Sequence, residues 1–131
     1  MANWENIDAC VLLATRNDEK TLPSCLESVE AAVSDRTWAL FASVNDSADN
    51  SYDIIHKFAS NSSAKVFSIE EYADSPSAAV AKNRAVKLSL PYRKKFPAYF
   101  FMDADDLMGE NRMSGLLEVA KKISWKLFPI R

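Results

Sequence analysis

The chain has 131 residues, 48% of them hydrophobic and 26% charged, which suits one soluble globular domain with its own core. A formal net charge of −2 excludes the broad basic surface that nucleic-acid binding requires. No apolar run approaches the ~20 residues needed to span a bilayer, and the first residues lack the pattern of a signal peptide. We therefore expect a single cytoplasmic domain over residues 1–131, with no membrane span and no nucleic-acid partner.

The first half of the chain predicts two strand–helix units. Apolar runs at residues 9–14 and 38–44 have the length of strands, and they are nearly continuous, as in strands covered on both faces. Cys10 lies in the first of these runs and is expected to be a buried or half-buried thiol, as is Cys25. After each run, apolar side chains recur at helical spacing: Leu22, Leu26, Val29 and Val33, then Ile54, Ile55 and Phe58.

The second half repeats this order twice. Apolar runs at residues 65–69 and 98–102 predict strands, and residues 89–97, with two prolines and three basic residues, predict a loop. In the helix between these strands we expect Lys82 to be turned away from the apolar stripe. The two helical stripes are Ala78, Ala81, Ala85 and Leu88, then Met113, Leu116, Leu117 and Ala120. Four strand–helix units predict a parallel α/β sheet with right-handed crossovers.

The chain contains only two glycines, Gly109 and Gly115. Neither belongs to a phosphate-binding pattern, which excludes both the dinucleotide-binding fingerprint and the P-loop. Any phosphate bound by this protein must be held in another way.

Polar residues follow three of the four expected strands, at residues 15–18, 45–47 and 103–106. The carboxyl ends of parallel strands share one rim of the sheet, and ligands bind there where the strand order reverses. Loops are commonly polar without any function, so each cluster alone is weak. Three clusters at one rim favour a ligand site.

The acidic run after the fourth strand predicts a metal site. Asp103 and Asp105 are two residues apart and can face the same ligand in an extended chain. Two adjacent carboxylates are unfavourable unless a cation lies beside them, and Mg²⁺ or Mn²⁺ binds such oxygens together with phosphate. Leu107 and Ser114 stand where an EF-hand needs oxygen ligands, so that alternative fails. Asp106 is assigned as the cap of the next helix.

Four motifs in this order resemble the amino-terminal half of a family 2 glycosyltransferase with the GT-A fold. They lie at residues 14–17, 44–51, 76–85 and 101–107, with Lys82-Asn83-Arg84-Ala85 as the core of the third. The resemblance covers residues 7–120. It implies a Rossmann-like, three-layer GT-A type fold with a mainly parallel central sheet flanked by helices. It also implies that the chain is a nucleotide-sugar-binding domain from which the acceptor-binding half is absent.

The resemblance assigns four residues to the nucleoside of the donor. Thr15 and Asn17 would lie beside the uracil and ribose, and Asn45 or Asp46 would accept a hydrogen bond from the base. Asn45 departs from the family pattern, which has an acidic residue there, but an amide oxygen can still accept a hydrogen bond. Ser47 replaces the usual glycine of this turn.

The resemblance assigns three further residues to the rest of the donor. Arg84 would approach the diphosphate or the sugar, Asp103 would contact the ribose or sugar, and Asp105, with Asp103, would hold the cation. The catalytic base is not identified. The only acidic residues after Asp106 are Glu110 and Glu118, both on or next to the expected fourth helix.

The resemblance, together with the acidic run, implies a metal-dependent hexosyltransferase. It would transfer a sugar, with inversion, from a nucleotide-diphosphate donor such as a UDP-sugar to an acceptor hydroxyl, with Mn²⁺ or Mg²⁺ as cofactor. The alternative is a non-catalytic or truncated nucleotide-sugar-binding module that needs another domain or chain. A nucleotidyltransferase is a further alternative, but it would need a glycine-rich triphosphate loop near the first strand, and the sequence has none there. The apolar residues 123–130 leave a further strand or a homodimer open.

Overall fold

The computed structural model describes residues 7, 9–33, 37–95 and 99–108 of the chain. The predicted fourth helix and the apolar residues 123–130 lie outside this described part. The longest helices within it have 12 residues, and none there has the length and apolarity that a membrane crossing requires.

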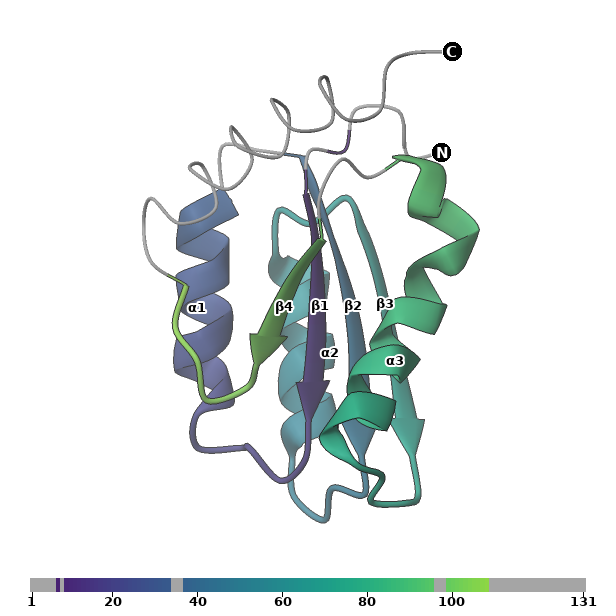
Figure 1. Cartoon of the computed structure of the whole chain (residues 1–131). Helices are drawn as coiled ribbons and strands as arrows, with labels where there is room; N and C mark the ends of the chain where they lie inside the picture. Colours follow the sequence, from purple (N-terminus) through teal and green to yellow (C-terminus); the bar gives the residue numbers. More distant parts are fainter. Residues whose placement is uncertain (1–6, 8, 34–36, 96–98, 109–131) are drawn as a thin grey trace.

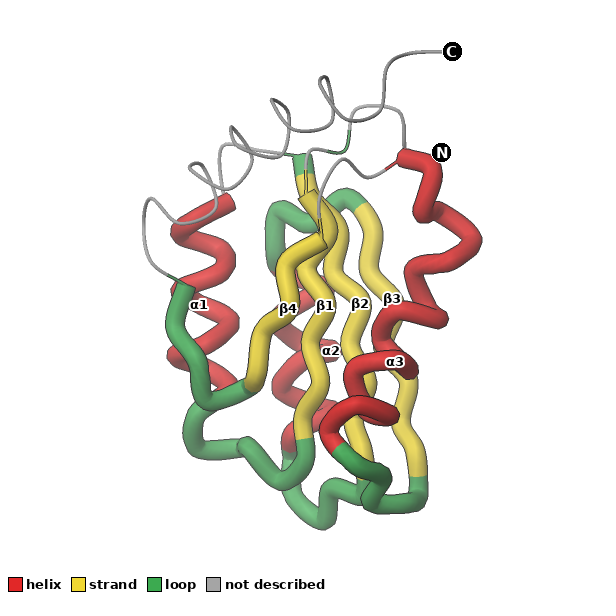
Figure 2. The backbone as a smooth tube through the Cα atoms, in the orientation of Figure 1, coloured by secondary structure: helices red, strands yellow, loops and turns green. Residues whose placement is uncertain are grey.

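The described residues form a four-stranded parallel sheet, as the strand–helix order predicts (Figures 1 and 2). The strand order is β3-β2-β1-β4. The chain adds β2 and β3 on one side of β1, and then places β4 on the opposite side of β1. This reversal lies between β1 and β4, which is where open α/β sheets bind ligands. The strands are β1 (Ala9–Thr15), β2 (Trp38–Asn45), β3 (Val66–Tyr72) and β4 (Tyr99–Asp103).

Helices cover both faces of the sheet, which explains why β1 and β2 are mostly apolar. One apolar cluster joins α1 and α2 to one face of the sheet, and a second joins α3 to the other face. Every residue of β2 is buried, and so is every residue of β1 except the half-buried Ala14. The helices are α1 (Leu22–Val33), α2 (Ser51–Asn61) and α3 (Ala78–Ser89). The three-layer arrangement predicted from the sequence is confirmed.

The outer strands are less buried than the central pair. On β4, Phe100 and Met102 pack into the cluster with α1, whereas Phe101 is 47% exposed on the opposite face. Phe67 on β3 is similarly exposed at 42%. Apolar burial, which stabilises by about 25 cal/mol per Å², is therefore concentrated at the two central strands. These strands provide a rigid base for the residues at their carboxyl ends.

The segment predicted as a loop after α3 is instead a 3-10 helix over Leu90–Lys95. Its Tyr92 ring stacks on the buried Phe41 ring at 5.8 Å between centroids, and this contact orders the segment. Both cysteines are buried free thiols, as predicted. Desolvation raises the pKa of Cys10 and is the main cause that raises the pKa of Cys25 to about 11, so neither is a ready nucleophile at neutral pH.

Candidate functional site

The polar residues that follow β1, β2 and β4 meet at one rim of the sheet, at the lower end of Figure 1. A cavity of about 250 Å³ opens there between the ends of these strands and the start of α3. Its walls combine apolar side chains of α3 with polar ones of the strand ends. The lining residues are Ala14, Thr15, Arg16, Asn45, Pro76, Ala78, Ala81, Lys82 and Asp103.

The loop after β1 is fixed to the loop after β2 by hydrogen bonds in both directions. The Asn17 backbone N–H donates to Ser47 Oγ at 2.9 Å, and the Ala48 N–H donates to Asn17 Oδ1 at 2.7 Å. Asn17 has φ 53°, a left-handed conformation that Asn tolerates better than most residues. Thr15 Oγ1 donates to Asp18 Oδ2 at 2.6 Å. Thr15 and Asn17 are thus part of a preformed rim, and Thr15 also lines the cavity.

Asn45 and Asp46 differ in exposure, although they are neighbours in the chain. Asn45 is 2% exposed, lines the cavity, and donates through Nδ2 to Ser43 O at 3.2 Å. Asp46 is exposed and has φ 47°. Its carboxylate accepts from the Ser75 hydroxyl and lies 3.6 Å from a guanidinium nitrogen of Arg16. Of this pair, Asp46 presents a carboxylate at the surface of the rim.

Arg84 is held at the ends of β2 and β3. Its guanidinium donates to both carboxylate oxygens of Asp74, at 2.9 and 2.8 Å, and to Asn45 Oδ1 at 2.8 Å. It also lies 4.2 Å from the centre of the Tyr72 ring. These bonds lower the pKa of the Asp74 carboxyl and raise that of Arg84. Arg84 does not line the cavity, and its expected contact with the donor stays a prediction.

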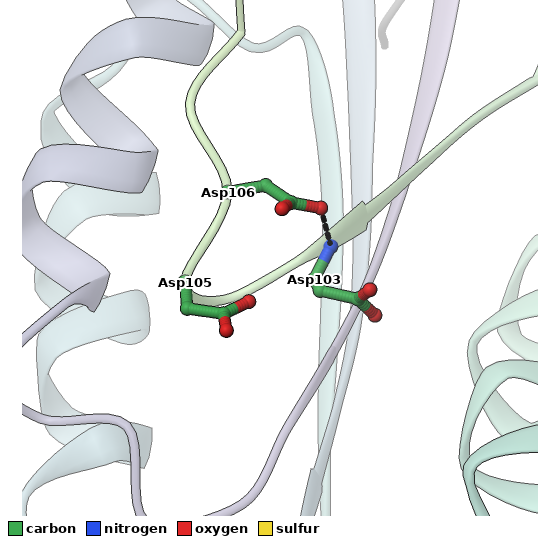
Figure 3. Close-up of side chains that lie close together, drawn as sticks. All are labelled: Asp103, Asp105 and Asp106. Carbon is green, nitrogen blue, oxygen red and sulfur yellow. Dashed lines mark hydrogen bonds between the residues drawn. The ribbon is translucent and has the colours of Figure 1, made fainter.

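Three carboxylates gather where β4 ends (Figure 3). Asp103, Asp105 and Asp106 each offer an oxygen, and these oxygens lie within 4.8 Å of one another. The Asp103 N–H donates to Asp106 Oδ2 at 3.3 Å, and the Asp106 N–H donates to Asp103 O at 2.9 Å, so a tight turn holds the group together. Asp106 therefore belongs to the cluster. The helix that it was expected to cap lies outside the described residues.

Lys82 is a residue of the site that the sequence interpretation misjudged. Its Nζ lies 3.6 Å from Asp103 Oδ1, and its side chain lines the cavity. The expectation that Lys82 turns away from the apolar stripe is wrong, because a residue four positions after Ala78 lies on the same side of a helix. That spacing was visible in the sequence.

The turn between β3 and α3 is a second feature that sequence reasoning missed. Tyr72, Asp74 and Ser75 supply partners to Arg84 and Asp46, yet they form no recognisable motif. The sequence signal that could have identified this turn was its place after a predicted parallel strand, because ligands bind at the carboxyl ends of such strands.

Comparison with known proteins identifies the family and the fold. A model of the family described as Glycosyl transferase family 2 matches residues 10–124. The structure resembles the crystal structure of S. aureus TarS 1-349, with a TM-score of 0.70 and 18% identity over 88% of this chain and 33% of that one. TarS 1-349 in complex with UDP gives a TM-score of 0.69 at 17% identity, covering 91% of this chain and 32% of that one.

The complex of TarS 1-349 with UDP-GlcNAc gives a TM-score of 0.66 at 18% identity, with 91% and 32% of the two chains covered. A search of curated proteins gave no significant match. The parallel sheet, its flanking helices and the match to TarS define a GT-A fold. The chain belongs to glycosyl transferase family 2, and it spans about a third of the length of the TarS chains that it matches.

Proposed function

We propose that this chain binds a UDP-sugar together with a divalent cation and transfers the sugar, with inversion, to an acceptor hydroxyl. One observation carries the proposal: Asp103 both lines the cavity and belongs to the acidic cluster. A nucleoside in the cavity would therefore have its diphosphate beside the carboxylates. The TarS complexes with UDP and UDP-GlcNAc, on the same fold, support this assignment.

The donor set of the acidic cluster fits Mg²⁺ or Mn²⁺. These cations are bound in proteins by one or two carboxylates plus phosphate oxygens and water. Asp105 and Asp103 are the proposed ligands, because Asp106 Oδ2 already accepts a backbone hydrogen bond. When bound, the cation would neutralise charge that develops on the leaving diphosphate. Lys82, close to Asp103, adds a positive charge from the protein itself.

The base end of the proposed site is the rim at β1 and β2. The Asp46 carboxylate would accept a hydrogen bond from the uracil N3–H. Thr15 and Asn45, which line the cavity, would lie against the nucleoside. Asn17 would support the same rim through its bond with Ala48. Asp103, besides binding the cation, would contact the ribose or the sugar, as the family resemblance implies.

A second candidate is a binding module that depends on another domain or chain for transfer. It is favoured because three carboxylates in the described part of the rim already accept hydrogen bonds within the protein. Asp18 and Asp49 accept hydrogen bonds from backbone or hydroxyl groups nearby, and Asp74 is bound by Arg84. These bonds leave the three carboxylates less free to serve as the base, which must lie within hydrogen-bond reach of the acceptor hydroxyl, about 2.6–3.2 Å.

One experiment tests the proposal and separates the two candidates. The purified chain is incubated with Mn²⁺ and UDP or a panel of UDP-sugars, and both thermal unfolding and UDP release are measured, with and without simple sugar acceptors. At a hundred times the dissociation constant, UDP with Mn²⁺ should raise the free energy of unfolding by about 2.7 kcal/mol. Slow, acceptor-independent UDP release would favour the module, and rapid acceptor-dependent release the enzyme. No stabilisation by any UDP compound would overturn donor binding.

A further inference from the structure

The side chain of Arg84 connects three elements that meet at the base end of the rim. It projects from α3, its guanidinium bonds to Asn45 at the end of β2 and lies over the Tyr72 ring at the end of β3, and Asp74 in the following turn holds it in place. Its side chain is only 18% exposed although it is charged. A paired and stacked guanidinium of this kind has one defined position, because its fork geometry is rigid.

This position determines the orientation of the Asn45 amide. Asn45 Oδ1 accepts from Arg84 at 2.8 Å, while Nδ2 donates to Ser43 O at 3.2 Å and to Ser43 Oγ at 3.1 Å. The guanidinium offers only donors and the Ser43 carbonyl only accepts, so a flipped amide would lose a bond at each end. Asn45 is buried, which makes such unsatisfied groups costly.

The same network restrains Asp46, the next residue. The Asp46 N–H donates to Tyr72 O at 2.8 Å, and its carboxylate accepts from Ser75, one residue after Asp74. Asp46 is also in the left-handed region, at φ 47°, which costs energy for a residue with a side chain unless its surroundings hold it there. Removal of the Arg84 side chain would therefore free both Asn45, which precedes Asp46, and the turn at Asp74 and Ser75, which supports Asp46.

We propose that Arg84 is a positioning residue for base selection. It acts through Asn45 and the Asp74 turn to aim the Asp46 carboxylate, and it does so without touching the donor. This inference rests on the proposed function, since it concerns the base end of the same site. It differs from a direct contact of Arg84 with the diphosphate, in which the loss of Arg84 would weaken every diphosphate ligand equally.

The test compares UDP with CDP. Uracil offers an N3–H donor to a carboxylate, whereas cytosine offers an acceptor at N3, so the ratio of the two affinities reports the alignment of Asp46. The variants are Arg84→Ala and, at the exposed partner, Asp74→Asn. Lys87→Ala removes one positive charge from an exposed position one turn further along α3 and is the matched control. Affinities for UDP, CDP and pyrophosphate are measured by calorimetry with Mn²⁺.

We expect Arg84→Ala and Asp74→Asn to lower the preference for UDP over CDP by on the order of tenfold, the scale of a hydrogen bond to a charged group. Pyrophosphate affinity should stay nearly unchanged in both, and Lys87→Ala should match the wild type. An unchanged preference for UDP over CDP in both variants overturns the inference but leaves the proposed function standing. Equal losses for UDP, CDP and pyrophosphate also overturn it, in favour of direct contact. If the wild type does not bind UDP, the proposed function fails, and the inference fails with it.

A measurement without nucleotide checks the structural step separately. The side-chain amide signals of Asn45 in ¹H–¹⁵N spectra should shift and exchange faster with water in Arg84→Ala and in Asp74→Asn. Lys87→Ala should leave them in place. Unchanged Asn45 signals in both network variants would contradict the step from Arg84 to Asn45, whatever the nucleotide affinities.

Discussion

Asp103, Asp105 and Asp106 occupy one turn of chain yet have different surroundings. All three are exposed, but Asp103 contacts Lys82 and lines the cavity, whereas Asp106 closes the turn on the Asp103 N–H. Their combined negative charge also contributes, after burial, to the raised pKa of Cys25 below them. An added divalent cation would offset this repulsion, since like charges at this separation destabilise one another.

Asp105→Asn should remove most of the dependence of UDP affinity on Mn²⁺, because it removes a charged ligand and keeps the size of the side chain. Asp106→Asn should retain most of that dependence, since an amide oxygen can still accept from the Asp103 N–H. UDP titrations of both variants by calorimetry, with Mn²⁺ and with a chelator, measure the difference. A larger loss in Asp106→Asn than in Asp105→Asn would reverse the proposed ligand assignment.

At the scale of elements, the two central strands are more deeply buried than the outer strands. Leu40 on β2 pairs with Phe67 on β3, but Leu40 is 1% exposed and Phe67 is 42% exposed. Leu40→Ala should lower the free energy of unfolding by about 2–5 kcal/mol, the cost of a cavity in a packed core. Phe67→Ala should cost about 1 kcal/mol. Urea unfolding followed by circular dichroism measures both, and equal costs would contradict the burial difference.

The strands and the first three helices could be predicted because each carries a local pattern: a continuous apolar run or a stripe at helical spacing. The 3-10 helix at Leu90–Lys95 could not, since its order comes from the contact of Tyr92 with Phe41, far away in the chain. Two prolines and three basic residues within residues 89–97 are typical of a loop, and tertiary packing overrode that local preference.

The acidic cluster could be predicted because its members are adjacent in sequence. The network of Asp74, Ser75 and Arg84 could not, because each side chain finds its partner across a turn or a strand end: Ser75 and Asp46 are 29 residues apart, and Arg84 and Asn45 are 39 apart. No spacing rule joins such pairs before the strand order is known.

At the scale of the whole molecule, the described sheet brings a cavity of about 250 Å³ and an acidic cluster together at the reversal between β1 and β4. The family match shows the glycosyl transferase family, and the likeness to TarS shows the GT-A fold. The cavity has polar and apolar walls, as small-molecule sites commonly do. The proposed donor must contact the cavity and the acidic cluster at the same time.

The most direct test of that requirement is a map of backbone ¹H–¹⁵N shift changes on addition of UDP with Mg²⁺, a cation that does not broaden the signals. The largest changes are expected in two groups at once, Thr15, Arg16 and Asn45 at the cavity and Asp103 to Asp106 at the acidic cluster, with little change at exposed residues of α2 such as Lys57. Omission of Mg²⁺ should abolish the changes at the acidic cluster. Saturable changes confined to residues away from this rim would contradict the account.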